Sequence, residues 1–459
     1  MGRRPVLIGL DESSLLRVLN HPEQMRNVAL VNNLLDRLDR VGHNPGDLYN
    51  FQTALFRYSY RAQWAVADIN RALKRLADGK GPDWQGQHDP DVLEFIGPLW
   101  TPVCSPDSRD PHDWELEAVA AARIVRQLRD VGDGLAWRVH RYDRAVITAL
   151  ANHPTSGLIV GKEGLGSEIG RIVATFRESG HFTLMHDLTS VLRHHDLTEV
   201  HANGYRELHE VKATQNRRTS KAAATQRRAA EAALAAAAGT APLEPTGAHI
   251  TRSPVQLRTH IRELSGVLDV AARDGHVSTR VGDRAVSVLH LPKVATSGAD
   301  FREVWESYQA RRAETRRRLM STAMNVLQGQ LTFQGQELRN PYFAPFSIYP
   351  LPPAQRTALI CDLVLVEFAM DAQVLAAGFE KQAMPARVLL DYTSRPGADV
   401  LTVETRSGRM TVHAAAVSQL LHEMVRTDCF VQAFSVDAAL TDEAGSFVLT
   451  FSNERSAWR

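Results

Sequence analysis

The most informative stretch of this 459-residue chain reads Asp196-Leu-Thr-Glu-Val-His-Ala-Asn-Gly-Tyr-Arg-Glu-Leu-His-Glu-Val-Lys-Ala213. Two runs of β-prone residues flank Asn203-Gly204, and Asn-Gly between such runs is the strongest short-range signal for a β-hairpin. Side chains alternate along a strand, so Glu210 and Lys212 in the second run share one face. An acid, Asp196, stands near the start of the first run. The stretch therefore predicts a hairpin that carries two carboxylates and a lysine.

The hairpin has the groups that metal-assisted phosphodiester chemistry needs. Two carboxylates bind a hard divalent cation such as Mg²⁺ or Mn²⁺ through oxygen, and a nearby lysine orients water or neutralises developing charge. Over residues 165–230, this pattern resembles the PD-(D/E)XK nuclease superfamily. Lysine is scarce, with seven residues among 53 lysines and arginines, and Glu210-x-Lys212 is the only E-x-K in the chain. His195 stands before Asp196, where the family pattern has proline.

The resemblance implies a mixed α/β fold with a restriction-endonuclease-like central mixed sheet flanked by helices. It implies a Mg²⁺-dependent endonuclease that hydrolyses phosphodiester bonds of nucleic acid, and DNA is the expected substrate. Asp196, Glu210 and the carbonyl of Val211 are the expected metal ligands, and Lys212 is expected to position the attacking water. The order of elements agrees: a helix with an acid, a strand with aspartate, a strand with E-x-K and a basic helix.

Two further acids compete for a place in the site. An apolar stripe at Ile169, Ile172, Val173 and Phe176 predicts a helix that starts near Ser167 and ends at Gly180. Glu168 borders the stripe, so it either completes the metal site, as the resemblance implies, or interacts with the helix dipole. Asp187 is the rival of Asp196, because His-Asp-Leu-Thr occurs at both 186–189 and 195–198.

The geometry of the turn decides whether Asp196 joins Glu210. A two-residue turn pairs residues whose numbers sum to 407, which sets Asp196 opposite Val211 and on the wrong face. A three-residue loop shifts the sum to 408 and brings Asp196 to the correct face. We therefore predict a bulge, a longer turn or a kink, with the two carboxylates roughly 3–5 Å apart.

A basic segment follows the hairpin and leads into an alanine-rich helix. Arginine and lysine supply most of the sequence-independent affinity for nucleic acid. A solvated helix face is the alternative interpretation. The expected nucleic-acid-binding residues are Arg217, Arg218, Lys221, Gln226, Arg227 and Arg228. Earlier in the chain, Gly157–Glu163 has the wrong spacing for a phosphate-binding loop.

Length and composition predict a globular protein of several domains. The hydrophobic fraction is 44%, the charged fraction is 23% and the net charge is +1, so nucleic-acid affinity must come from local patches. Three dispersed cysteines and the lack of long apolar runs favour a cytoplasmic protein with no membrane segment. We expect a mostly helical region at 1–150, the nuclease domain at 151–335 and an α+β accessory domain at 340–459. Strands at 277–291 would flank the central sheet, and 430–436 would form another strand.

The flanking regions suggest roles beyond cleavage. They are candidates for homo-oligomer or partner-subunit contacts, and a bacterial nuclease with such regions suits restriction or phage defence. The alternative function is a non-catalytic nucleic-acid-binding or scaffold subunit on the same fold. Metal-dependent cleavage by the purified protein would favour the nuclease, and binding without cleavage would favour the alternative.

Overall fold

The computed structural model describes residues 11–83, 94, 100–151, 159–201, 206–209, 211, 221–244, 246–298, 300–320, 326–332, 343–389, 399–405, 408–438, 447–451 and 457–458. The protein combines many helices with several small sheets, which confirms the expected mixed α/β class. Its contacts divide into two compact units. Unit 1 comprises residues 1–140, 150–231 and 335–341, and unit 2 comprises 141–149, 232–334 and 342–459. The N-terminal helices and the hairpin therefore share one unit, whereas the sequence-based ranges separate them near residue 150.

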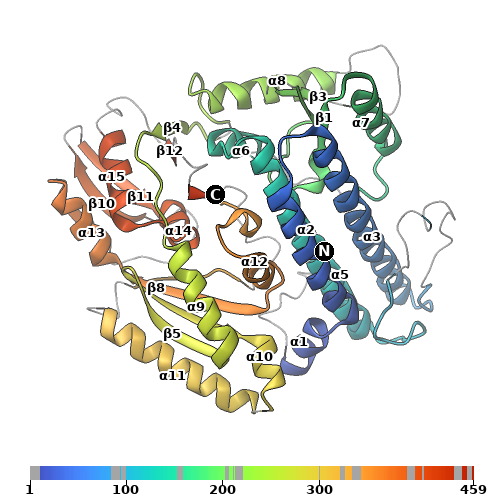
Figure 1. Ribbon diagram of the computed structural model, residues 1–459, viewed down its shortest axis with the longest axis horizontal. Coiled ribbons are helices and arrows are strands. Elements are labelled where there is room, and N and C mark those ends of the chain that lie inside the picture. The colour runs from blue at the N-terminus through green and yellow to red at the C-terminus, as the bar shows by residue number, and fades with distance from the viewer. Residues whose placement is uncertain are drawn as a thin grey trace. The chain divides into compact units, whose positions relative to one another are not determined.

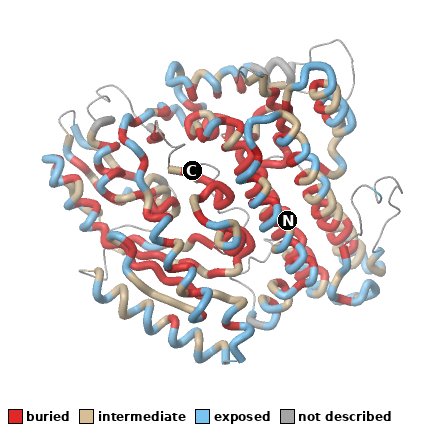
Figure 2. The backbone as a smooth tube through the Cα atoms, viewed as in Figure 1, coloured by how far each residue is buried: buried red, intermediate tan, exposed pale blue. Residues whose placement is uncertain are grey.

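Long helices form the N-terminal part of unit 1. They are α1 (Glu12–Leu19), α2 (Pro22–Arg40), α3 (Pro45–Ala77) and α5 (Pro111–Val139). The last three each begin with proline, which lacks the amide hydrogen that the first turn leaves unpaired. Their N-cap side chains, His21, Asn44 and Asp110, accept hydrogen bonds from first-turn amides. Helices α2 and α3 pack against α5 (Figure 1), which is buried along most of its length (Figure 2).

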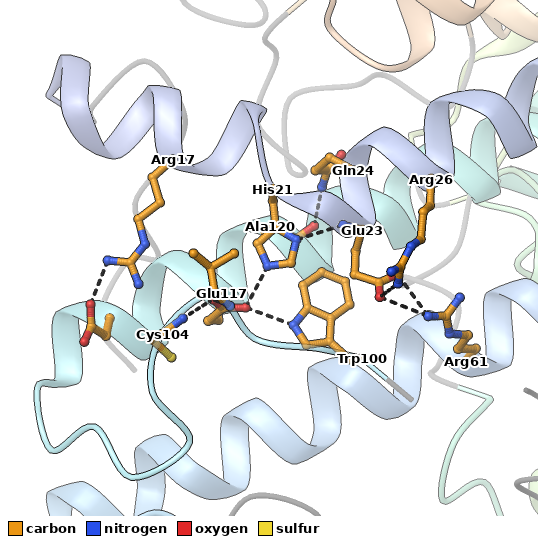
Figure 3. A network of polar contacts seen from close by, with 12 residues as sticks. Arg17, His21, Glu23, Gln24, Arg26, Arg61, Trp100, Cys104, Glu117 and Ala120 are labelled. Carbon is orange, nitrogen blue, oxygen red and sulfur yellow. Dashed lines mark hydrogen bonds and ion pairs between the residues drawn. The ribbon is translucent and has the colours of Figure 1, made fainter. Parts of the chain in front are cut away.

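A buried glutamate joins these helices to the segment between α3 and α5 (Figure 3). Glu117 Oε2 lies 3.0 Å from His21 Nε2 and accepts a hydrogen bond from Trp100 Nε1 at 2.9 Å. Its Oε1 accepts hydrogen bonds from the amides of Val103 and Cys104. Burial opposes the charge on Glu117, but hydrogen bonds from His21 and Trp100 hold the pKa of this carboxyl below its ordinary value. A charge that makes this many hydrogen bonds is tolerated in a core, so the network specifies how these segments pack.

The second part of unit 1 contains the predicted hairpin. Its elements are α7 (Leu165–Ser179), β1 (Phe182–Met185), the short 3-10 helix η2 (His186–Leu188), β2 (Leu197–Val200), β3 (Arg206–His209) and α8 (Lys221–Ala237), which runs into unit 2. The strands form an antiparallel sheet in the order β1-β2-β3. Helix α7, which directly precedes β1 in the chain, packs on β1, and so does α3, which is distant from it in sequence. The small sheet is therefore supported by helices both near and distant in sequence.

Unit 2 is built around a four-stranded antiparallel sheet. Its strands are β5 (His276–Val281), β6 (Arg284–His290), β8 (Val364–Asp371) and β7 (Val326–Gln330), in that order. Helices α9 (Ile261–Asp274) and α11 (Phe301–Leu319) pack on β5 and β6. The strands predicted at 277–291 exist, but the expectation that they flank the hairpin sheet is wrong, because β6 pairs with β8. Alternation of side chains identifies a strand without identifying its partner.

The rest of unit 2 consists of short elements. Residues 430–436, predicted as a strand, lie in helix α15, because a short apolar run is compatible with either state. A parallel pair joins β4 to β12, and a second sheet has the order β11-β10-β9. The elements are α6 (Arg144–Ala151, which ends in unit 1), β4 (His249–Ser253), α10 (Leu291–Thr296), η3 (Phe346–Ile348), α12 (Pro353–Ile360), α13 (Ala372–Lys381), β9 (Ala386–Val388), β10 (Asp399–Thr405), β11 (Gly408–His413), α14 (Ala414–His422), α15 (Thr427–Ala438) and β12 (Phe447–Phe451).

Candidate functional site

Three carboxylates converge on the side-chain nitrogen of one lysine in unit 1. Lys162 Nζ lies 2.7 Å from Glu168 Oε1, 2.7 Å from Asp187 Oδ2 and 2.8 Å from Asp196 Oδ1. The three carboxylate oxygens therefore lie no farther from one another than about twice this nitrogen–oxygen distance of 2.7–2.8 Å. They come from α7, from η2 and from the residue that precedes β2. The cluster brings together two predicted site acids, Glu168 and Asp196, and the predicted rival, Asp187.

Glu168 belongs to the buried face of α7. Its side chain is 1% exposed, and Ile172 and Thr175, one and two turns later, are buried beside it. Ile169, which the apolar stripe placed on this face, is exposed instead. Glu168 Oε2 makes no hydrogen bond among the residues that the structure describes. A buried carboxylate oxygen without a partner is costly, so the cluster retains capacity for another positively charged or hydrogen-bonding group.

The ends of α7 explain how Glu168 reaches this position. The helix begins at Leu165, and its N-cap is Gly164, with a left-handed φ of 89°, in place of the predicted Ser167. The predicted end is confirmed: Gly180 is the C-cap, with φ 68°. Glu168 lies in the first turn of α7, close to the lysine that precedes the helix.

Helix α5 holds the loop that carries Asp187. The Asp133 carboxylate accepts hydrogen bonds from the amide of Ser190, at 2.6 Å, and from its hydroxyl. The preceding residue, Gly132, permits close approach of the loop backbone, since a Cβ at this position would lie 2.0 Å from the carbonyl oxygen of Leu188. Burial raises the pKa of Asp133 to about 6, although the bonds from Ser190 oppose the shift. The glycine and the aspartate together fix where the loop crosses α5.

Helix α3 holds strand β1 and the segment before Lys162 through two glutamine side chains. Gln52 donates to the carbonyl of Thr183 at 2.8 Å and accepts from the amide of Met185 at 2.9 Å. It thereby satisfies backbone groups of β1, an edge strand that would otherwise expose them. Gln63 accepts a hydrogen bond from the amide of Ile159 at 2.6 Å, just before the turn that carries the lysine. One helix therefore positions both β1 and the lysine segment.

The hairpin register agrees with the predicted longer turn. Residue numbers of the β2–β3 pairs, from Leu197–His209 to Val200–Arg206, sum to 406, so residues 201–205 connect the strands and a two-residue turn is excluded. The even sum puts Asp196 on the strand face that the site requires. Its amide donates to the His209 carbonyl at 3.1 Å, and its Oδ2 accepts from the Val211 amide at 2.8 Å. The predicted convergence with Glu210 lies outside the described residues.

Burial and crowding of charge shift the ionisation of the cluster. Burial raises the pKa of Glu168 to about 7; Lys162 opposes the shift, and Asp196 and Asp187 add to it. Burial acts to lower the pKa of Lys162, but hydrogen bonds to the three carboxylates raise it above its ordinary value overall. The lysine is therefore a permanent cation near neutral pH, while Glu168 exchanges its proton there.

The other predicted site residues have mixed outcomes. Val211 lies beside Asp196, and the contact that the structure gives it is through its amide nitrogen. Arg228 is exposed on α8. Helix α8 also contains Lys221, Gln226 and Arg227, whose side chains lie outside the described part of the structure. Four predicted residues lie outside the described residues altogether: Glu210, Lys212, Arg217 and Arg218.

Lys162 is the site residue that sequence reasoning missed. Its segment was considered only as a phosphate-binding loop, and it failed that test. The available signal was the scarcity of lysine combined with Gly161 on one side and the glycine N-cap of α7 on the other; both glycines have positive φ. That signal marks a structured turn but does not identify the acids that the lysine contacts.

Comparisons with known proteins assign this chain to no family. The chain matches no protein-family model, no curated protein and no solved structure. None of the helices in the described part of the chain is both long and apolar enough to cross a membrane.

Proposed function

We propose that this protein is a metal-dependent nuclease that hydrolyses phosphodiester bonds, with DNA as the substrate. The observation that carries the proposal is the convergence of Glu168, Asp187 and Asp196 on one cationic position. The sequence resemblance supplies the reaction class, and two of the three acids were expected at the site on that basis. Restriction or phage defence remains the biological setting that this class suggests.

The donor atoms fit a hard divalent cation. All three groups offer carboxylate oxygens, which Mg²⁺ and Mn²⁺ prefer. The ammonium of Lys162 marks a point that three carboxylates already surround, and the second oxygen of Glu168 has no partner among the described residues. Asp187, Asp196 and Glu168, together with Glu210 and the Val211 carbonyl from the sequence prediction, would hold the ion. When bound, the ion would stabilise the leaving oxygen and the charge of the in-line displacement.

The protein's own residues have separable roles in this proposal. Lys162 stays protonated and donates hydrogen bonds, so on release from the carboxylates it binds a non-bridging phosphate oxygen. Glu168, with a pKa of about 7, accepts or releases a proton near neutral pH. Lys212 remains the residue predicted to position water. The two lysines would then act from different segments of the chain, Lys162 on the phosphate and Lys212 on the water.

The order of elements supports a restriction-endonuclease-like core. Helix α7 carries Glu168, the strand pair β2 and β3 follows Asp196, and the basic helix α8 comes next. This is the order that the resemblance requires. The exposed Arg228 on α8 is consistent with a surface for the phosphate backbone.

One observation favours a non-catalytic alternative. Lys162 already neutralises part of the negative charge of the cluster, and buried ion pairs often serve specificity of packing without any chemistry. In that case the protein would be a binding or scaffold subunit. The two functions differ in their response to Mg²⁺, which the alternative does not need.

Cleavage assays distinguish these functions. Purified protein is incubated with plasmid and single-stranded DNA, with Mg²⁺, Mn²⁺ or a chelator. We expect metal-dependent cleavage that Asp196→Asn, Asp187→Asn and Glu168→Gln each reduce by orders of magnitude, since each acid would serve the transition state. Glu178→Gln is the matched control, because Glu178 is exposed on the same helix as Glu168. Binding without cleavage by the wild type would establish the alternative, and full activity in all three variants would place the active site outside the acid cluster.

A further inference from the structure

A second group of potential metal ligands lies at the other end of β2. His181 directly precedes β1 and His201 directly follows β2, while Glu199 lies within β2 opposite Thr183. In the antiparallel β1–β2 register, His181 and His201 are therefore the next residues beyond the Phe182–Val200 pair. One ligand atom of each lies within 4.8 Å of the others. The topology alone brings the three side chains together.

Contacts among these residues show how the ligand atoms converge. His181 Nδ1 lies 2.9 Å from Glu199 Oε1, and His201 Nε2 lies 3.9 Å from the same oxygen. The two imidazole rings are 4.4 Å apart between centroids. A third imidazole, that of His209, lies 3.0 Å from Glu199 Oε2. Three imidazoles therefore surround one carboxylate that is almost fully buried, with 9% of its side chain exposed.

This group differs from the acid cluster in place and in chemistry. Asp196 and Glu199 are three residues apart, so their side chains point to opposite faces of an extended strand. Asp196 and His201 bracket β2, and five residues of strand span roughly 16 Å. The acid cluster offers only oxygen, which suits Mg²⁺. The second group mixes imidazole nitrogen with a carboxylate, which suits Zn²⁺ and other borderline cations.

We propose that His181, Glu199 and His201 form a binding site for a Zn²⁺-like divalent cation, with His209 as the candidate fourth ligand. Two histidines and a glutamate are a ligand set that zinc accepts, and the fourth position completes its tetrahedral preference. The strands of this sheet are four residues long. Sheets this small are marginal alone, so a cation joining β1, β2 and β3 would act as a structural cross-link.

Arg171 also contacts the Glu199 carboxylate, but it does not replace a bound cation. Its guanidinium lies 3.6 Å from Glu199 Oε2, and its side chain is 51% exposed. The arginine therefore neutralises the carboxylate weakly and from solvent. A cation bound by Glu199 Oε1 and the two histidines leaves this contact in place. Glu207 Oε2, 3.6 Å from His201 Nε2, adds negative charge nearby.

Metal titration of the full chain tests the proposal. After chelator treatment and dialysis, the protein is titrated with Co²⁺ as a spectroscopic substitute and with Zn²⁺ in competition. We expect one site with nitrogen ligation, displacement of Co²⁺ by Zn²⁺ but not by excess Mg²⁺, and a higher thermal midpoint with one equivalent of Zn²⁺. His181→Ala and His201→Ala should each weaken binding by at least about 100-fold, since even partners outside the ligand shell are worth 10–100-fold.

Controls keep the outcome decisive. His112→Ala removes an exposed histidine of unit 1 and should leave Co²⁺ binding unchanged. Asp187→Asn alters the acid cluster and should leave the nitrogen-ligated Co²⁺ site unchanged. Glu199→Gln preserves shape and should abolish binding without unfolding, judged by circular dichroism. Absence of a nitrogen-ligated site in the wild type, wild-type affinity in the histidine variants, or loss of the site in Asp187→Asn would overturn the proposal.

Discussion

Replacing Gly132 by alanine tests whether α5 positions the loop that carries Asp187. The added Cβ would lie 2.0 Å from the carbonyl oxygen of Leu188, and that atom belongs to backbone. Carbon and oxygen atoms normally approach no closer than about 3.3 Å, so the loop must move by roughly 1 Å. Overpacking of this kind costs about 1–3 kcal/mol, which a gain of about 0.5–1 kcal/mol in helix propensity partly offsets.

The expected result has two parts that are measured separately. A net loss of about 1 kcal/mol lowers the thermal midpoint of a unit of this size by about 2–4 °C. Movement of the loop by about 1 Å also displaces Asp187 from Lys162, and misplacement on that scale costs about 100-fold in rate. Differential scanning calorimetry measures the first effect, and Mg²⁺-dependent cleavage at a temperature well below the transition measures the second.

A second glycine provides the matched control. Gly170 also lies inside a helix, α7, but a Cβ there would have no atom within 4 Å. Gly170→Ala should therefore stabilise the protein by about 0.5–1 kcal/mol and leave cleavage unchanged. If Gly132→Ala behaves like Gly170→Ala in both measurements, the close approach of α5 to the loop does not determine the position of Asp187.

Further predictions concern charged groups. Glu117→Gln should destabilise unit 1 by about 3 kcal/mol near neutral pH, because it breaks a buried charged network. Since the folded pKa of Glu117 is lowered, its contribution is present above the unfolded value and is lost as pH falls through the folded value, which urea unfolding at pH 7 and pH 3 would reveal. The pKa of Glu168 is raised to about 7, so its charge destabilises the fold increasingly from pH 4.5 to 7, by up to ~3 kcal/mol. Glu168→Gln should remove that pH dependence of stability. In the wild type, the Mg²⁺ affinity measured by calorimetry should rise with pH until about 7. Lys162→Met should lower the thermal midpoint without metal, because three carboxylates lose their common cation, and Mg²⁺ should restore it; no response to Mg²⁺ would argue against a cation site. Charge reversal at Arg227 and Arg228 should weaken DNA binding across all sequences and flatten its salt dependence, and unchanged affinity at low salt would assign this face of α8 to solvent.

Local signals in the sequence predict much of the site. The Asn203-Gly204 turn signal and alternating β-prone residues locate β2 and β3, and the requirement that Asp196 face Glu210 predicts a turn longer than two residues, in agreement with the register. The apolar period of 165–179 and Gly180 locate α7 and its end. Asp196 and Glu168 follow from these elements, because each stands at a fixed offset from a strand start or a helix start.

Long-range pairing explains what the sequence leaves open. Lys162 contacts acids 25 and 34 residues away, and no local period records such a contact. The same limit applies to sheets, since the alternation in β5 and β6 indicates strands but not that β6 pairs with β8. The sequence could not show whether Asp187 or Asp196 belongs to the site. In the structure both carboxylates lie within 2.8 Å of the Lys162 ammonium, so neither excludes the other.

The N-terminal helices support the candidate site from outside the acid cluster. Their described residues include no member of the acid cluster, but three of their buried side chains hold backbone next to it. Gln52 fixes β1, Gln63 fixes the turn before Lys162, and Asp133 fixes the loop after Asp187. Each uses a buried polar group to satisfy backbone that would otherwise lose its hydrogen bonds, and such groups are costly to replace. Substitution of Gln63 by methionine should therefore reduce Mg²⁺-dependent cleavage more than a change of equal size on the exposed face of α3, because it removes the hydrogen bond that holds the Ile159 amide.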